Sequence, residues 1–184
     1  MSNSNDGQKV VIIDTGCANL SSVKFAVERL GYRVEVTYDA DAIRAADKVF
    51  LPGVGAAGAA MEIINERGLV DVVRGLKQPV LGICLGMQLM TAFSEEGNVN
   101  CFGLTDDNVA PLDANGLRLP HMGWNTLSEI ADHPLFSGVT RSDYFYFVHS
   151  FCVSQSDTTL ATCEYGQTFA ASIGRNNFMG VQFH

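Results

Sequence analysis

One cysteine of this chain stands in a stretch that could hold a nucleophile. Cys84 follows the short apolar run Val80–Ile83, and glycines flank it in the sequence Gly82-Ile83-Cys84-Leu85-Gly86. A strand, a sharp turn and a helix with the reactive side chain at the turn form a nucleophile elbow, which small flanking residues permit. A thiol at the start of a helix lies near the positive end of the helix dipole, so we expect the thiolate to be favoured. The alternative is an inert cysteine buried at a strand end.

A cysteine nucleophile needs a base, which in sequence can lie far away. The histidines of the chain are His121, His133, His149 and His184. His133 precedes Pro134 in a polar turn, and His121 lies in the loop-like run Pro120–Asn125. His149 and His184 each end a predicted strand. Spacing alone does not choose among the four, because histidine is also common as a structural polar group.

A glycine-rich run indicates a second possible kind of chemistry, the binding of a dinucleotide. Gly53-Val54-Gly55-Ala56-Ala57-Gly58 matches the dinucleotide fingerprint Gly-X-Gly-X-X-Gly. The match follows the third predicted strand instead of the first, and the carboxylate expected some 20 residues on is missing, because Asp71 falls within a predicted helix. We therefore favour backbone N–H groups at Gly53–Gly55 as donors to a developing oxyanion, and we expect no cofactor.

The elements that must position these residues alternate in the first half of the chain. Apolar runs predict strands at 9–14, 32–38, 48–51 and 80–83, and helical patterns lie at 21–30, 40–46, 56–67, 69–76 and 87–93. This order indicates an α/β fold with a mostly parallel open sheet and flanking helices. After about residue 94, short runs at 107–112, 144–148, 159–163, 168–173 and 178–183 predict a strand-rich section that is partly antiparallel.

The composition limits the function classes. The chain has 184 residues, of which 47% are hydrophobic, and we expect a flexible tail at 1–8 and one domain at 9–184. A net charge of −8 disfavours nucleic acid and anionic membranes as partners, and we see no membrane-spanning or signal segment. Five cysteines without a CxxC pair disfavour a disulfide framework or a zinc site, which predicts a reducing cytoplasm and no metal.

Three runs together resemble a known family. Gly82–Gln88, Val148-His149-Ser150 and Val181-Gln182-Phe183-His184 are similar to the motifs of class I (triad) glutamine amidotransferases. Leu51–Gly55 and Pro120–Asn125 narrow the resemblance to the glutaminase subunits of imidazole glycerol phosphate synthase, which serve histidine biosynthesis. The similarity extends from Val10 to His184 and implies a flavodoxin-like α/β fold.

The resemblance implies a role for each matching residue. It makes Cys84 the nucleophile that attacks the glutamine amide, and His184 the base. It places the oxyanion donors at Gly53, Val54 and Gly55, with the Leu85 amide as a further donor. The residues implied for glutamine binding are Gln88, Glu96, His149, Ser150 and Phe151. The family often has Tyr at the position of Phe151, a change that backbone contacts would tolerate.

The resemblance also implies a partner. Ammonia released from glutamine would pass to a (β/α)8 cyclase subunit, which makes imidazole glycerol phosphate and aminoimidazole carboxamide ribotide. Asn19, Met122, Trp124 and Asn125 are the residues that we place at this heterodimer interface. The phosphorylated substrate would lie on the partner, which fits the acidic charge of this chain.

One departure from the family pattern concerns the triad. In the family the histidine is followed by Pro, by a Glu that orients the imidazole, and by a helix, whereas this sequence ends at His184. We expect the natural chain to continue beyond it. Two alternatives to the proposed reading remain open at this point. One is a glutaminase subunit of another synthase, and the other is a non-catalytic α/β module that binds a partner and uses Cys84 structurally.

Overall fold

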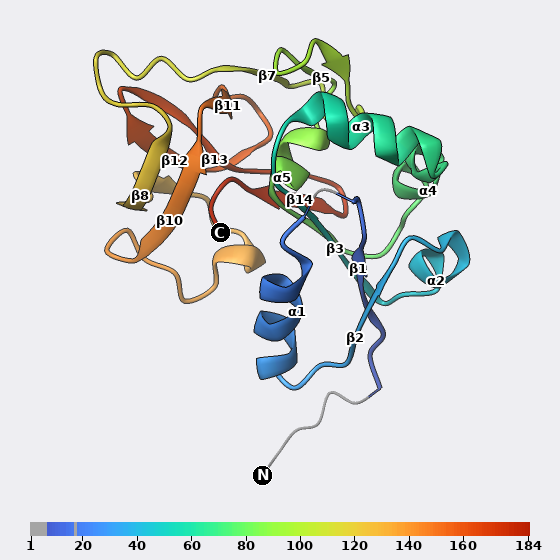
Figure 1. Cartoon of the computed structure of the whole chain (residues 1–184). Helices are drawn as coiled ribbons and strands as arrows, with labels where there is room; N and C mark the ends of the chain where they lie inside the picture. Colours follow the sequence, from blue (N-terminus) through green and yellow to red (C-terminus); the bar gives the residue numbers. More distant parts are fainter. Residues whose placement is uncertain (1–6, 17) are drawn as a thin grey trace.

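A computed structural model describes residues 7–16 and 18–184 of the chain. Most of the predicted tail 1–8, and Cys17, lie outside the described residues. Figure 1 shows a central sheet with helices beside its first half and a two-stranded ribbon beside its second half. The predicted fold class, a mostly parallel open sheet joined to an antiparallel section, is confirmed.

Five parallel strands form the half of the sheet that holds the predicted elbow. They are β1 (Val10–Ile13), β2 (Val34–Thr37), β3 (Lys48–Gly53), β4 (Val80–Cys84) and β14 (Phe178–Val181). Their order across the sheet is β2-β1-β3-β4-β14. The last strand of the chain thus lies beside the strand that ends at Cys84, and Val181 pairs with Ile83. This register brings residues that are far apart in the sequence to one edge of the sheet.

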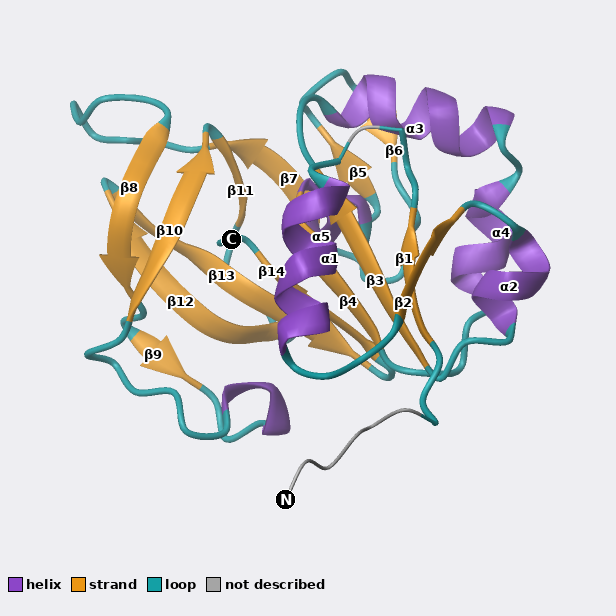
Figure 2. Cartoon of the chain, turned by 60° about the horizontal axis from the view of Figure 1, so that its bottom comes forward, coloured by secondary structure: helices purple, strands orange, loops and turns teal. Residues whose placement is uncertain are grey.

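Helices cover both faces of this half. They are α1 (Leu20–Arg29), α2 (Ala40–Arg44), α3 (Ala57–Glu66), α4 (Leu69–Arg74) and α5 (Leu85–Leu89). Side chains of α2, α3, α4 and α5 share one buried cluster with alternate residues of β1 and β3. Figure 2 shows α1 across the sheet from α3 and α4. Among the described residues, no helix is long and apolar enough to cross a membrane.

The second half of the sheet is built mainly from antiparallel pairs. Its strands are β5 (Phe93–Ser94), β6 (Val99–Asn100), β7 (Asn108–Pro111), β9 (Glu129–Ile130), β11 (Phe151–Val153), β12 (Thr159–Tyr165) and β13 (Gln167–Arg175). The short 3-10 helix η1 (Pro134–Phe136) follows β9 in the chain. β13 pairs with β14, β11 and β12, so it joins the two halves. A second buried cluster, rich in phenylalanine, lies between this part of the sheet and the ribbon.

The ribbon corrects the sequence prediction. It consists of β8 (His121–Thr126) paired with β10 (Tyr144–His149), whereas the sequence predicted a loop at 120–125. The strand was missed because its alternation is reversed. His121 faces the core and is 3% exposed, while Met122 and Trp124 face outward and are 61% and 69% exposed. A polar-in, apolar-out pattern is the opposite of the usual sign of a strand on a core.

Two helix predictions also need correction. The helix expected at 87–93 is α5, which begins at Leu85 and ends at Leu89, because Phe93 already starts β5. The Thr91 hydroxyl donates to the Gln88 carbonyl at 2.7 Å and closes the helix end. The helix expected at 21–30 is α1, which begins at Leu20 and ends at Arg29, and its apolar residues are mostly uncovered: Val27 is buried, but Phe25 is 58% exposed.

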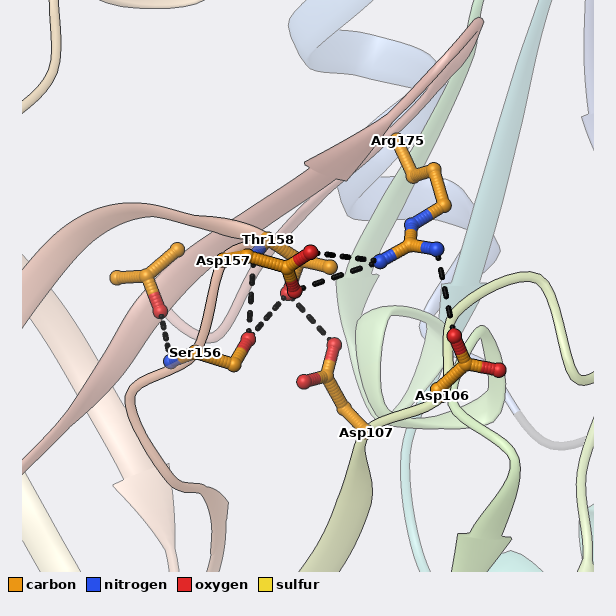
Figure 3. Close-up of polar contacts among 7 residues, drawn as sticks. Asp106, Asp107, Ser156, Asp157, Thr158 and Arg175 are labelled. Carbon is orange, nitrogen blue, oxygen red and sulfur yellow. Dashed lines mark hydrogen bonds and ion pairs between the residues drawn. The ribbon is translucent and has the colours of Figure 1, made fainter.

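A polar cluster ties the two loops at the far edge of the sheet together. Figure 3 shows the Arg175 guanidinium between the carboxylates of Asp106 and Asp157, with both ion pairs at 3.3 Å. Beside it, the buried hydroxyl of Thr158 donates to Asp107 at 2.6 Å. These contacts hold the residues just before β7 against those just before β12 and against Arg175 at the end of β13.

Candidate active site

The elbow at Cys84 has the geometry that the sequence predicts. β4 ends at Cys84 and α5 begins at the next residue. Cys84 has φ 56° and ψ −113°, a backbone conformation that is rare for a residue with a side chain and is typical of strained functional turns. A Cβ added at Gly86 would lie within 1.7 Å of the Leu51 carbonyl oxygen, and one at Gly82 would lie 2.8 Å from the backbone of Gly86. The flanking glycines are therefore required by close backbone packing.

The environment of the Cys84 thiol contradicts the expectation that its thiolate is favoured. Cys84 is 8% exposed, and burial raises its pKa to about 11. The backbone N–H of Leu85 and the side-chain amide of Gln182 lower the pKa, while the negative charge of Glu96 raises it. The predicted thiolate at a helix end is therefore not favoured in the isolated chain, because desolvation outweighs these donors. The helix α5, with five residues, also carries only a small dipole.

A pocket of about 230 Å³ opens beside the thiol. It brings together nearly all of the site residues expected from the sequence: Val54, Gly55, Cys84, Leu85, Gln88, Glu96, His149, Ser150, Phe151 and His184. Gly53 lies on the wall of a neighbouring pocket of about 370 Å³, which shares Val54, Val148 and His184 with the first. These residues come from the ends of β3 and β4, from α5, from the segment after β5, from the connection of β10 to β11, and from His184.

The structure distinguishes the four histidines, all of which it describes. His133 accepts a hydrogen bond from the Leu135 amide at 3.1 Å and caps η1, so it is structural. His121 is buried beneath the ribbon, and His149 lines the pocket but uses both ring nitrogens in hydrogen bonds. His184 lines the same pocket as Cys84, and burial lowers its pKa, which favours the neutral imidazole that a base requires.

The glycine run after β3 lies directly beside the nucleophile. Gly53 pairs with Cys84 in the parallel register of β3 and β4, and a Cβ on Gly53 would lie 3.0 Å from the Leu85 side chain. Gly55 has φ 90°, which glycine adopts without strain. This run therefore lies beside Cys84, and the backbone N–H of Leu85 hydrogen-bonds to the thiol.

Glu96 is held at the pocket by a helix start. Its carboxylate accepts a hydrogen bond from the Ala57 amide at 3.2 Å, at the beginning of α3. The N-cap residue Ala56 has no side chain that could satisfy this end of the helix. Glu96 therefore caps α3 from a distant part of the chain and at the same time lines the pocket as a fixed negative charge.

A hydrogen-bond chain behind the pocket connects residues whose contacts with one another the sequence did not predict. The Phe151 carbonyl accepts from His149 Nδ1 at 2.9 Å, so that nitrogen carries the proton. His149 Nε2 then accepts from His121 Nδ1 at 2.9 Å, and His121 Nε2 faces Asn125 Nδ2 at 3.3 Å. Both imidazoles are neutral, and burial lowers their pKa values to about 4.

On the other side of the same carbonyl, two glutamines lead to the thiol. Gln88 Nε2 donates to the Phe151 carbonyl at 3.0 Å and to Gln182 Oε1 at 2.8 Å. Gln182 Nε2 lies 3.7 Å from Cys84 Sγ. In the sequence, Gln182 stands within a predicted strand and within the motif Val181-Gln182-Phe183-His184, and no role was predicted for its side chain. The signal that could have found it is an amide in the otherwise apolar run before His184, and the structure buries this amide fully.

The residues expected at a partner interface lie on the ribbon and at the start of α1. Met122 and Trp124 stand on the outer face of β8, next to the exposed Tyr144 on β10. Asn125 is only partly exposed and donates to the Glu164 carbonyl at 3.0 Å, so it holds the ribbon to β12. Asn19 caps α1 by accepting from the Ser22 amide at 3.4 Å and lines the second pocket.

Comparison with known proteins gives a consistent family. Residues 11–184 match the family described as glutamine amidotransferase class-I. The imidazole glycerol phosphate synthase subunit HisH of Vibrio cholerae is 55% identical over 183 residues, covering 96% of this chain and 90% of the relative. The subunit of the same name from Colwellia psychrerythraea is 54% identical over 191 residues, covering 96% of this chain and 85% of the relative.

Solved structures with low sequence identity share the fold. A glutamine amidotransferase from Thermotoga maritima superposes with a TM-score of 0.66 at 16% identity, over 96% of this chain and 75% of that chain. Another structure described as a glutamine amidotransferase gives a TM-score of 0.72 at 17% identity, over 95% of this chain and 89% of the other. With its elbow, its pocket and these relatives, the chain belongs to the class-I glutamine amidotransferase family and, within it, to the imidazole glycerol phosphate synthase subunits HisH.

Proposed function

We propose that this chain hydrolyses L-glutamine to glutamate and ammonia through Cys84, as the glutaminase subunit of imidazole glycerol phosphate synthase in histidine biosynthesis. The observation that carries the proposal is the shared pocket of Cys84 and His184, which also presents Gln88 and Glu96. It is supported by relatives about 54% identical that bear the name of this subunit. That identity also favours this synthase over the glutaminase of another one.

The chemistry follows from the geometry of the elbow. Cys84 Sγ attacks the side-chain amide carbon of glutamine, and His184 takes the thiol proton. The carbonyl oxygen becomes an oxyanion, which the amides of Val54, Gly55 and Leu85 stabilise by about 3 kcal/mol for each well-placed donor. The C–N bond then breaks, and His184 gives the proton to the departing ammonia. Water, deprotonated by His184, hydrolyses the γ-glutamyl thioester, and the Cys84 thiol is restored with release of glutamate.

Substrate recognition uses the polar wall of the pocket. Both amide protons of Gln88 are donated to protein acceptors, so its Oε1 is the atom available for the α-ammonium group of glutamine. The carboxylate of Glu96 adds negative charge for the same ammonium. Backbone groups of His149, Ser150 and Phe151 would hold the α-carboxylate at the opposite end of the pocket, where the loss of a tyrosine hydroxyl at Phe151 has little effect.

The partner is a (β/α)8 cyclase subunit that docks on the ribbon and the start of α1. Exposed Met122, Trp124 and Tyr144 supply the large apolar side chains that anchor protein interfaces. The second pocket shares Val54, Val148 and His184 with the pocket of the thiol, and Asn19 and Tyr146 also line it. Ammonia would leave through this side and reach the cyclase, which consumes it to form imidazole glycerol phosphate and aminoimidazole carboxamide ribotide.

The isolated subunit should hydrolyse glutamine slowly. Burial holds the Cys84 pKa at about 11, and the glycine run at 53–55 can shift its amides when a partner docks beside it. Partner binding then both aligns the oxyanion donors and prevents waste of ammonia. This gives the proposed function a measurable signature, which is glutaminase activity that depends on the cyclase.

The test is a glutamate-release assay with and without the cyclase subunit and its nucleotide ligand. We expect activity with the partner, and loss of about 10³-fold or more in Cys84→Ala. Trp124→Ala should weaken the response to partner concentration while leaving the fold intact. Hydrolysis that survives in Cys84→Ala would show that this thiol is not the nucleophile. Full activity without any partner would contradict the dependence on docking.

A further inference from the structure

The amide of Gln182 is the polar side chain placed directly behind the nucleophile. Gln182 is fully buried, one residue beyond the Val181–Ile83 pair of the sheet, so the register sets it beside Cys84. Its backbone N–H donates to the Ala171 carbonyl at 2.9 Å, which fixes the main chain here. Its side chain lies between Cys84 Sγ, 3.7 Å from Nε2, and Gln88 Nε2, 2.8 Å from Oε1.

The direction of this amide is set by a backbone carbonyl two steps away. The Phe151 carbonyl can only accept, so Gln88 must turn its NH₂ group toward it. The second proton of that NH₂ group requires an acceptor, and therefore Gln182 must turn its oxygen toward Gln88. The NH₂ group of Gln182 is then left facing the sulfur. If the Gln182 amide were flipped, its NH₂ group would face the NH₂ group of Gln88. Two buried donors would then face each other with no acceptor, which costs about 1–3 kcal/mol.

The same carbonyl also anchors the histidine chain. His149 donates to it, His121 donates to His149, and Asn125 faces His121, so every bond in this chain has one allowed direction. The rings are packed between aromatic side chains, with His121 stacked on Phe147 and on Tyr165. The Phe151 carbonyl is thereby held in place from the ribbon side, and it cannot turn away from Gln88.

We propose that Gln182 is a positioning residue for the Cys84 thiol, and that the Phe151 carbonyl sets the direction of its amide through Gln88. The inference rests on the proposed glutaminase function and adds a residue to that site. An N–H donor aimed at sulfur stabilises the thiolate and opposes the burial and the Glu96 charge that act against it. It also holds Sγ on the pocket side of the strained elbow, in line for attack.

The thiolate can be measured without glutamine. Alkylation of Cys84 by iodoacetamide, quantified on its own peptide by mass spectrometry, reports the thiolate fraction of this one cysteine. At about pH 9, Gln182→Leu should slow Cys84 alkylation about tenfold, which corresponds to a rise of about 1 in the thiol pKa. Gln182→Glu should slow it further, because a carboxylate accepts from Gln88 but turns a negative oxygen toward the sulfur.

The chain provides a matched control. Gln167 Nε2 donates to the sulfur of Cys152 at 3.2 Å, away from the pocket, so Gln167→Leu removes the same type of bond elsewhere. It should leave Cys84 alkylation unchanged. Unfolding curves check that each variant folds, and the near-isosteric Gln182→Glu serves if Gln182→Leu does not fold. Equal Cys84 alkylation rates in the wild type and in the folded Gln182 variants would overturn the proposal.

A second pair of variants tests the direction of the amide. Gln88→Leu removes the donor that orients Gln182, so it should also slow Cys84 alkylation, and the double variant Gln88→Leu/Gln182→Leu should be no slower than Gln182→Leu alone. Additive effects would overturn the role of Gln88 in this orientation. A Gln182 effect on alkylation in a chain that releases no glutamate with the cyclase would instead contradict the proposed function and leave the positioning role standing.

Discussion

The two halves of the sheet hold the active site by different physical means. In the parallel half, close packing of backbone fixes the nucleophile, and Gly86 lies against β3 with no room for a side chain. In the antiparallel half and its ribbon, a hydrogen-bond chain that runs from Asn125 through the buried His121 and His149 to the Phe151 carbonyl fixes the opposite wall of the pocket. Packing leaves a periodic trace in the sequence, whereas a polar chain of this kind is distributed over distant segments.

The largest effect should come from adding a side chain at the elbow, where two backbone segments are in close contact. Gly86→Ala places a Cβ within 1.7 Å of the Leu51 carbonyl, which forces backbone movement, and we expect the free energy of unfolding to fall by about 3 kcal/mol. Denaturant unfolding measures it. The control is Gly58→Ala in α3, where the new Cβ would meet Gly97 at an ordinary 3.6 Å and should not destabilise the chain. Equal stabilities of the two variants would contradict packing as the constraint.

The polar chain should make stability depend on pH. His121 and His149 have pKa values lowered by burial from 6.5 to about 4, so between these values the unfolded chain binds protons that the folded chain does not. Stability is therefore full above pH 6.5 and is lost as the pH falls toward 4. Between about pH 7 and pH 5 we expect a loss of about 2 kcal/mol for each histidine, measured by urea unfolding.

The matching variant for this profile is His121→Phe/His149→Phe, which retains aromatic packing and removes both titrating groups. Its stability should fall less steeply over the same pH range, because the pKa shifts of His121 and His149 no longer contribute and the lowered pKa of His184 remains. His149→Gln, which retains His121, should lie between the two. Parallel profiles of wild type and double variant would show that the pair does not titrate on unfolding.

The smallest effect concerns the contacts of Figure 3, which join the far loops of the antiparallel half. Arg175→Gln breaks two exposed ion pairs and should lower the free energy of unfolding by less than about 1 kcal/mol, with less effect at high salt. Thr158→Val removes the buried hydroxyl that donates to Asp107 and should cost more, about 1 kcal/mol. Reversal of this order would mean that exposed charge outweighs the buried bond here.

Much of the parallel half could be predicted from sequence. The run Val80–Ile83 and the glycines around Cys84 give the strand and the turn, and the alternation of strands and helices gives the sheet class. The length of α5 could not be predicted, because the early β5 pairing at Phe93 competes with helix continuation. The thiol pKa could not be predicted either, since the local sequence indicates the backbone donor at Leu85 but neither the Gln182 donor nor the burial of Cys84.

The strand β8 of the ribbon and the long-range contacts of the site could not be predicted from the sequence. The sequence determined the catalytic residue types, the elbow and the family, because local spacing and motif identity carry that information. The tertiary structure alone showed that His149 and His184 line one pocket with Cys84, and that Gln182 faces its sulfur. The physical reason is that a buried hydrogen bond is fixed by what lies opposite each donor, and here those partners are 94 residues apart between Gln88 and Gln182.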